Sequence, residues 1–450
     1  MKQKLLYALA SVAVVCSAYV AWRLPAEDTP YILSQSPGWE ARKLLNVGDA
    51  AENGFRMVGT PDGLGAYANG DGTITLLMNH EIGADDGIAR KHGSKGAFIS
   101  KWTIDIESLR VTSGSDLIEK TVPENLSFRK FCSADLPPSA ALFDASTGKG
   151  YHQPLFMNGE EDKTGGRAFA HTLEGTTYEL ADLGKIAWEN ALALPVSGEQ
   201  TAVIGLDDNY DGLVLIYIGQ KKKAGNPIQQ AGLTGGKLYS LQVSDNRFKL
   251  VELPNGAGLN YRQLKELAIS LGVTRFERPE DGSWDPQRPG VFWFAVTDRL
   301  GGRSQLIKLA FDDTLDLLAG GQFDIALQAR DIGGEMFDNL TVDSAGRVLV
   351  QEDSGDDPHL ASIWLFQPES KSASKIFESD PTRFSGFWPS RITDDEEHSG
   401  IIEVTELVRT ASWFEPSKLY YLGTTQAHHA HPDSELVSYG QLWLISGPKE

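Results

Sequence analysis

Short runs of carboxylates interrupt the sequence directly after segments that favour β-strands. Two of these runs, at 207–212 (DDNYDG) and 352–357 (EDSGDD), each hold four acidic or amide side chains within six residues. Calcium prefers oxygen ligands of this kind, supplied by flexible loops. Asp207, Asp208 and Asp353 are therefore candidate metal ligands. Neither run has the spacing of an EF-hand loop, and a solvated turn is the alternative interpretation.

A third run, at 394–398 (DDEEH), carries five ionisable side chains. It leads into the apolar pair at 401–402, so it lies against a core element and not in a tail. Glu397 is a candidate ligand within it. Near the C-terminus, His428 and His431 could bind a transition metal. An ordinary loop is the alternative for these two histidines.

Several common catalytic motifs are missing from the sequence. It has no G-x-S-x-G nucleophile turn, no H-E-x-x-H and no paired C-x-x-C. The stretch at 232–237 (GLTGGK) fails as a P-loop because Leu238 stands where Ser or Thr must reach magnesium. The chain has two cysteines, Cys16 and Cys132, so a disulfide framework is excluded. Cys132 is either a buried inert thiol or a reactive or metal-binding one.

The elements that must position these residues are short β-strands. Strand-like segments occur in six pairs, and in each pair the first segment ends in acidic or His residues. Such repetition predicts six copies of one unit whose strand ends converge on an axis, an all-β, six-bladed β-propeller. A β-sandwich with acidic loops is the alternative. The pairs lie at 73–79 with 97–106, 153–157 with 167–172, 201–206 with 213–219, 291–297 with 305–311, 347–351 with 362–366, and 419–425 with 441–445.

A few segments interrupt the strand pattern. Residues 261–273 place Leu264, Leu267 and Leu271 at helical spacing and predict a small helical insertion. Residues 185–193 are a second candidate helix. Residues 221–236 are rich in Gly and Lys and predict a surface loop.

The N-terminus has the pattern of an export signal. Lys2 and Lys4 precede an apolar run at 5–22, which predicts a signal peptide or a signal anchor over 1–26. Residues 27–450 form a single domain without a linker. We therefore expect a periplasmic or secreted protein, held at a membrane only if the N-terminal segment stays attached.

The net charge limits the kinds of molecule that the protein can bind. The 61 acidic residues exceed the 41 basic ones and give a net charge of −20. This charge opposes binding to nucleic acid or to an anionic membrane surface. Carboxylates that converge in a propeller channel repel one another, so they require metal ions or protonation. A multi-metal site of this kind suits phosphoryl chemistry, because metals clamp phosphoryl oxygens and activate an oxygen nucleophile.

Five segments of the chain together form a recognisable pattern. They are LLMNHE (76–81), MNGEED (157–162), FERPEDG (276–282), FDNLTVDSAGRVLVQEDSG (337–355) and EEHSGIIEVT (396–405). Together they resemble the PhoX-type alkaline phosphatases, and the resemblance runs in order from about residue 50 to the end of the chain. It implies a six-bladed propeller with calcium and iron ions in its channel, which releases phosphate from small-molecule monoesters outside the cytoplasm.

The resemblance also implies roles for individual residues. It makes Glu81, Glu160 and Glu280 metal ligands, with Glu396 or Glu397 as a further carboxylate. It places Arg278 and Asn339 as the residues that face the phosphate.

The sequence departs from the family pattern at one notable position. Gly159 stands where the family typically has a cysteine that binds iron. The thiolate is therefore missing, or Cys132 supplies it from elsewhere in space. Loss of the thiolate affects binding of the expected Fe3+ more than binding of the expected Ca2+, because Ca2+ needs only oxygen ligands. It leaves two alternatives open on the same scaffold: a calcium-dependent esterase or lactonase, and a calcium-stabilised binding propeller without catalysis.

Overall fold

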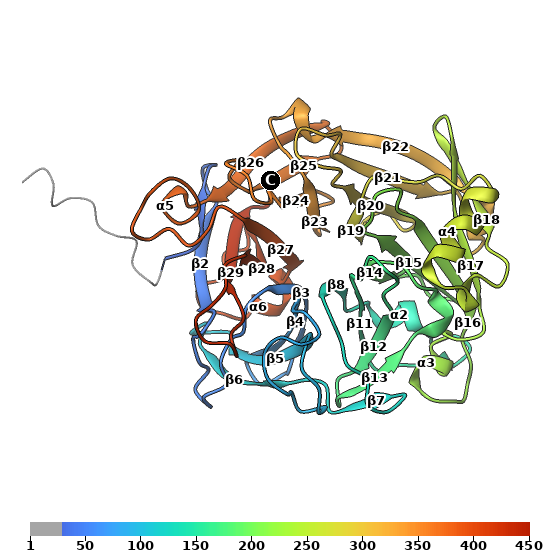
Figure 1. Ribbon diagram of the computed structural model, residues 1–450, viewed down its shortest axis with the longest axis horizontal. Helices are drawn as coiled ribbons and strands as arrows, with labels where there is room; N and C mark the ends of the chain where they lie inside the picture. Colours follow the sequence, from blue (N-terminus) through green and yellow to red (C-terminus); the bar gives the residue numbers. More distant parts are fainter. Residues whose placement is uncertain (1–28) are drawn as a thin grey trace, which may run out of the picture.

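The computed structural model describes residues 29–450, so the predicted signal segment at 1–26 lies outside the described residues. Antiparallel sheets radiate from a common centre in a propeller-like arrangement (Figure 1). The strands nearest the centre contact one another in a closed ring. These inner strands are β3 (Pro61–Ala68), β8 (Phe131–Asp135), β14 (Trp188–Ala193), β19 (Pro279–Trp284), β23 (Phe337–Val342) and β27 (Glu396–Glu403).

Three further strands follow each inner strand outward. The second strands are β4 (Thr73–His80), β11 (Leu155–Glu160), β15 (Gln200–Asp207), β20 (Val291–Val296), β24 (Val348–Glu352) and β28 (Lys418–Ala427). The third are β5 (Phe98–Asp105), β12 (Ala168–Thr172), β16 (Val214–Gln220), β21 (Gln305–Phe311), β25 (Ser362–Gln367) and β29 (Tyr439–Pro448). The fourth are β6 (Val111–Asp116), β13 (Thr176–Glu179), β17 (Lys237–Ser244), β22 (Gly321–Gln328), β26 (Ser372–Ser379) and β2 (Glu40–Asn46).

Added strands extend or join these sheets. β1 (Ile32–Ser34) pairs with β26, and β7 (Lys120–Val122) pairs in parallel with β13. β18 (Arg247–Glu252) continues from β17 and pairs with β22 over two residues, so a nine-stranded sheet runs from β14 to β19. β9 (Phe143–Asp144) and β10 (Lys149–Gly150) form a short hairpin.

The sheet of β27, β28, β29 and β2 draws strands from both ends of the described chain. β2 pairs with the C-terminal strand β29 from Glu40↔Ser446 to Asn46↔Gln441. Backbone hydrogen bonds between segments about 400 residues apart therefore hold the first and last parts of the described chain together in one sheet.

The hydrophobic core lies between neighbouring sheets. One cluster joins Leu155 and Met157 of β11 to Trp188 of β14 and Tyr217 of β16. Because each sheet is covered on both faces, its middle strands are apolar on both faces and β28 is buried along nearly its whole length. Such strands appear in the sequence as continuous apolar runs, which explains why the second and third strands could be predicted.

The helices are few and short. The predicted insertion at 261–273 is confirmed as α4 (Tyr261–Ser270), which begins at Asn260 with a capping box. The structure also contains α2 (Ser139–Leu142), α3 (Pro227–Gln230), α5 (Pro381–Phe384) and α6 (Thr405–Val408), with 3-10 turns at η1 (Ala181–Leu183), η2 (Gly256–Gly258), η3 (Leu317–Ala319) and η4 (Ala329–Asp331). Within 29–450, no helix has the length and apolar character needed to cross a membrane.

Two sequence expectations about local structure need correction. The predicted helix at 185–193 is wrong, because this segment forms the inner strand β14. Its Ala, Leu and Glu residues favour a helix, but pairing with β15 overrides that weak preference. The segment at 221–236 is not simply a surface loop, since it contains α3 and buries Ile228 and Leu233.

Candidate functional site

The inner and second strands pair in the same register in every sheet. The first residue of the inner strand lies opposite the last residue of the second strand. One extra residue then bulges from the inner strand, directly after this pair in five cases and after His398 in β27. A bulge of this kind locally re-aims side chains. The residue pairs are Pro61↔His80, Phe131↔Glu160, Trp188↔Asp207, Pro279↔Val296, Phe337↔Glu352 and Glu396↔Ala427.

This register brings one ionisable side chain per inner strand to the centre. Each of these side chains belongs to the second residue of its strand, and all of them are buried. We call this set the inner ring: Asp62, Cys132, Glu189, Glu280, Asp338 and Glu397.

A second set of side chains follows the second strands. We call it the outer ring: Glu81, Glu161, Asp208, Asp353 and His428. Each is the residue directly after its strand. The equivalent position after β20 is Thr297, whose hydroxyl donates to the Phe337 carbonyl oxygen at 2.5 Å and does not line the cavity.

A cavity of about 390 Å³ opens between the two rings. Its walls contain the outer ring and all of the inner ring except Asp62, together with Thr60, Lys130, Lys163 and Arg278. The eight lining carboxylates exceed the three permanent cations by five. Such an excess in a poorly solvated space strongly favours bound cations or protonated carboxyls.

One side of the cavity is neutralised by the chain itself. Lys130 Nζ lies 3.1 Å from both Glu81 and Glu161. Lys163 Nζ continues the series at 3.6 Å from Glu161 and 3.2 Å from Asp208.

Arg278 is the last cation in this row of alternating acidic and basic side chains. Its Nε lies 2.7 Å from Asp208 Oδ1 and its terminal nitrogen lies 2.8 Å from Glu280 Oε1. The cationic side chains therefore cover the side from Glu81 to Glu280. On the other side, His428 Nε2 lies 3.7 Å from Glu397.

Two carboxylate oxygens of the inner ring lack hydrogen-bond partners within the described chain. These buried oxygens belong to Asp62 and Asp338, whereas Glu280 Oε1 contacts the Arg278 guanidinium. Unpaired buried oxygens are costly and suggest a ligand. Two groups also hold their ligand atoms within 4.8 Å of one another. One consists of Asp62, Glu81 and Cys132, and the other of Glu189, Glu280 and Asp338.

The electrostatics of the inner ring disfavour ionised carboxyls. Burial, with the nearby Asp208 carboxylate, raises the pKa of Glu280 well above its usual range despite Arg278. Burial and the Glu397 and Glu189 carboxylates do the same to the pKa of Asp338. The three-carboxylate group offers hard oxygen donors suited to calcium, and the group with the Cys132 thiol also suits a transition metal.

In the outer ring, the charged forms of Asp208 and His428 are favoured, although burial still raises the pKa of Glu161 despite its lysine partners. Burial acts to raise the pKa of Asp208, but the Arg278 guanidinium outweighs it and holds this pKa well below its usual range. His428 is partly buried, which acts to lower its pKa, but hydrogen bonding to Asp395 and the Glu397 carboxylate outweigh this and raise the pKa to about 9. His428 is therefore protonated at neutral pH.

Six predicted site residues lie at this cavity, and three do not. Glu81, Asp208, Arg278, Glu280, Asp353 and Glu397 line it. Glu160, Asp207 and Asn339 each lie one residue before or after a lining residue and point to other partners.

Glu160 makes a two-point ion pair with Arg167, at 2.7 Å from Nε and 2.6 Å from the terminal nitrogen. Its neighbour Glu161 lines the cavity, so the proposed ligand role passes from Glu160 to Glu161. We expect Glu161→Gln to alter metal content and activity. Glu160→Gln should leave both nearly unchanged and lower stability by about 1–3 kcal/mol. Elemental analysis, activity and melting of the two variants test this, and equal losses of metal in both would contradict it.

Asp207 and Asn339 do not line the cavity, but their hydrogen bonds hold neighbouring parts of the site in place. Asp207 accepts hydrogen bonds from the backbone amides of Ala187 at 3.0 Å and Leu213 at 3.1 Å. Asn339 Nδ2 donates to the Ser133 hydroxyl at 2.6 Å, and Ser133 donates to Glu189 at 2.6 Å. Asn339 thus acts on the cavity through Glu189.

The position that departs from the family pattern has no space for a side chain. A Cβ on Gly159 would lie 2.2 Å from the Trp188 Cβ. We expect Gly159→Cys to destabilise the protein by about 1–3 kcal/mol through overpacking and to add no metal. Thermal melting and elemental analysis check this, and a gain of iron without a loss of stability would contradict it. The thiol at the site belongs to Cys132, whose Sγ donates to Asp62 at 3.3 Å.

Sequence reasoning missed much of the inner ring, namely Asp62, Glu189 and Asp338. It also missed Lys130 and Lys163. A short repeat could have revealed the inner ring, because five of its six members directly follow Pro, Phe or Trp. The repeat reads PDG, FCS, WEN, PED and FDN.

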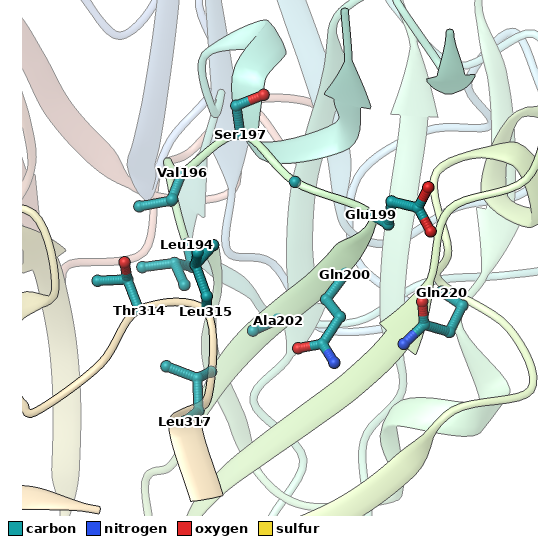
Figure 2. Close-up of a pocket in the computed structure, with 11 residues that line it drawn as sticks. Leu194, Val196, Ser197, Glu199, Gln200, Ala202, Gln220, Thr314, Leu315 and Leu317 are labelled. Atoms are coloured by element: carbon teal, nitrogen blue, oxygen red, sulfur yellow. The ribbon is translucent and has the colours of Figure 1, made fainter. Parts of the chain in front are cut away.

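A different cavity, of about 320 Å³, lies between β15 and the loop before β22 (Figure 2). Leu194, Leu315 and Leu317 form one side, and Glu199 stands apart on the other (Figure 2). It brings together no cluster of carboxylates, so it does not match the chemistry of the central cavity.

Comparisons with known proteins were made by sequence and by structure. No family model and no curated protein sequence matches the chain. The fold is similar to that of Pseudomonas fluorescens PhoX in complex with vanadate, a transition state analogue. The TM-score is 0.63 at 13% identity, over 94% of this chain and 97% of that chain. This likeness supports a distant structural relationship.

Two other structures are less similar. The PQQ-bound aldose sugar dehydrogenase of Streptomyces coelicolor gives a TM-score of 0.38 at 11% identity, over 90% of this chain and 98% of that chain. An α-L-arabinofuranosidase of Podospora anserina in complex with cellotriose gives 0.34 at 10% identity, over 92% and 98%. Neither likeness bears on function.

Proposed function

We propose that the chain is an exported, metal-dependent phosphatase that hydrolyses phosphate monoesters in its central cavity. The observation that carries the proposal is the inner ring, with unpaired buried carboxylate oxygens beside a guanidinium in one cavity. In this proposal β14–β18 and β19–β22 are two blades, and the whole is a six-bladed propeller. The fold likeness to PhoX supports the same function.

The residues present fit metal ions. Glu189, Glu280 and Asp338 would hold Ca2+, and Asp62, Glu81 and Cys132 would hold iron or another transition metal. Bound there, such ions supply positive charge that offsets the carboxylates and polarises a phosphoryl oxygen. Asp207 and Glu160, which the sequence predicts as metal ligands, belong to neither group. Glu161, which lines the cavity, replaces Glu160 as a further candidate ligand.

Arg278 is the group best placed to bind the phosphate of a substrate. Its side chain is 16% exposed, and Asp208 fixes its Nε edge. A guanidinium held in this way presents its remaining N–H groups in a fixed geometry that suits phosphate oxygens. Lys130 and Lys163, both about half exposed, add positive charge at the same wall.

His428 is the candidate proton donor. Its Nδ1 lies 3.3 Å from Asp395 and its Nε2 lies 2.9 Å from Gln426 Oε1, which together fix the ring at the cavity wall. Because its pKa is raised to about 9, it keeps a proton into the alkaline range and can donate it to a leaving oxygen.

A direct assay tests the function. The purified protein is incubated with an aryl phosphate at alkaline pH, with calcium and iron, and again after chelation. Parallel assays use an aryl acetate and a lactone. Phosphate release that chelation abolishes supports the proposal. Turnover of the acetate or lactone alone would replace it with a metal-dependent esterase or lactonase. A calcium-dependent rise in melting temperature without any turnover would replace it with a binding protein.

A further inference from the structure

The loop between α5 and β27 displays an aromatic side chain at the surface. Phe387 is 104% exposed and its neighbour Trp388 is 39% exposed. The loop itself is held in place, since the Ser390 hydroxyl donates to the Thr382 carbonyl oxygen at 2.9 Å and the Ile392 amide donates to the Arg383 carbonyl oxygen at 2.7 Å. Phe387 is therefore exposed on a loop that hydrogen bonds hold in place.

The described chain begins beside this loop. Arg383 donates to the Thr29 hydroxyl at 2.8 Å, and the Tyr31 and Phe384 rings meet edge to face at 5.5 Å. Figure 1 shows α5 at the periphery, beside β2 and away from the centre. The apolar run at 5–22 ends only seven residues before Thr29. If this run is embedded in a bilayer, an extended connection of that length places Thr29 within about 25 Å of the membrane.

Strand direction places the loop at the same end of the molecule as the cavity. β27 begins at Glu396, next to the inner-ring residue Glu397, so the preceding loop lies at the cavity end. Eight residues after Phe387, Asp395 pairs with His428 at the cavity wall. Contact of this loop with a surface would thus fix the orientation of the cavity.

We propose that Phe387 inserts into the interface of the membrane that holds the N-terminal segment, and that this contact orients the cavity end of the molecule. Trp and Tyr side chains favour the interfacial region of bilayers, and Phe is among the apolar residues that interfacial helices bury there. Because the net charge is −20, the partner is a zwitterionic lipid surface and not an anionic one. The proposal does not depend on the reaction in the cavity.

A pair of tryptophan variants tests the proposal in the full chain, reconstituted in phosphatidylcholine vesicles. Phe387→Trp places a fluorophore on the loop. Leu315→Trp is the matched control, because Leu315 is 67% exposed and lies in the loop after β21, at the opposite end. We expect brominated acyl chains to quench the added emission of Phe387→Trp several-fold more than that of Leu315→Trp. Because both side chains are exposed, neither substitution should change the melting temperature. Unchanged melting temperatures would confirm that both variants fold.

Two outcomes would overturn the proposal. Equal quenching of the two variants would show that the loop does not reach the lipid. Protection of the Phe387→Trp emission from aqueous acrylamide without quenching by brominated lipid would show that the loop packs on protein instead.

Discussion

Replacing Glu280 with glutamine removes metal from the central cavity and lowers phosphate release by at least about 100-fold. Glu280 is buried, its Oε1 lies 2.8 Å from the Arg278 guanidinium, and its ligand atoms lie close to those of Glu189 and Asp338. Loss of groups that merely orient metal ligands already costs about 10–100-fold, so loss of a ligand should cost more. Elemental analysis and initial rates of phosphate release measure the two effects.

In contrast to its activity, the stability of the metal-free Glu280→Gln variant should increase. Burial raises the pKa of Glu280, so its ionised form destabilises the metal-free fold, and glutamine removes that charge. Metal-free Glu280→Gln should therefore melt at a higher temperature than metal-free wild type at pH 8. Glu160→Gln is the control, because Glu160 lies outside the cavity. Unchanged metal content and activity in Glu280→Gln would remove Glu280 from the site.

Chelation makes the stability of the protein strongly dependent on pH. Burial, with the Asp353 carboxylate, raises the pKa of Glu397 to about 8, and the pKa values of Asp338 and Glu280 are also raised. Carboxyls in the unfolded chain titrate near 4. Each protonated carboxyl contributes stability that is fully present below about pH 4 and is lost as pH rises toward the folded pKa. Between about pH 4 and pH 8, Glu397 alone accounts for on the order of several kcal/mol.

The metal-loaded protein should behave differently, because bound cations favour the ionised carboxylates. We expect the melting temperature of the chelated protein to fall markedly between pH 5 and pH 8, and the gap to the loaded protein to widen over the same range. Calorimetric scans of both forms at matched ionic strength measure this. Parallel curves for the two forms across that range would show that the inner ring binds no metal.

The second and third strands could be predicted because they are buried on both faces and form long apolar runs. The inner strands could not, since each has an ionisable side chain as its second residue and contains a bulge that interrupts the alternating pattern. β14 illustrates the difficulty, because the residues that form it favour a helix when taken alone. Without the inner strands, the clearest signals were the acidic runs directly after the predictable second strands. Of the inner ring, Glu280 and Glu397 were predicted as ligands, with Cys132 as an alternative.

The assignment of individual site residues depended on a register that the sequence does not display. Glu160 and Glu161 are adjacent and chemically alike, and only the pairing Phe131↔Glu160 determines which one reaches the cavity. The pairing Trp188↔Asp207 likewise determines that Asp208, and not Asp207, reaches the cavity. Cys132 is 27 residues away from Gly159 in the sequence, so its place in the inner ring follows from the closed arrangement of strands and not from local pattern.

The most direct test of the account is a crystal structure of the metal-loaded protein, with anomalous scattering recorded at the iron and calcium edges. The account predicts ions among Glu189, Glu280 and Asp338 and beside Cys132. Ions bound only among the acidic groups outside the cavity, or an inner ring without any ion in protein that releases phosphate, would contradict it.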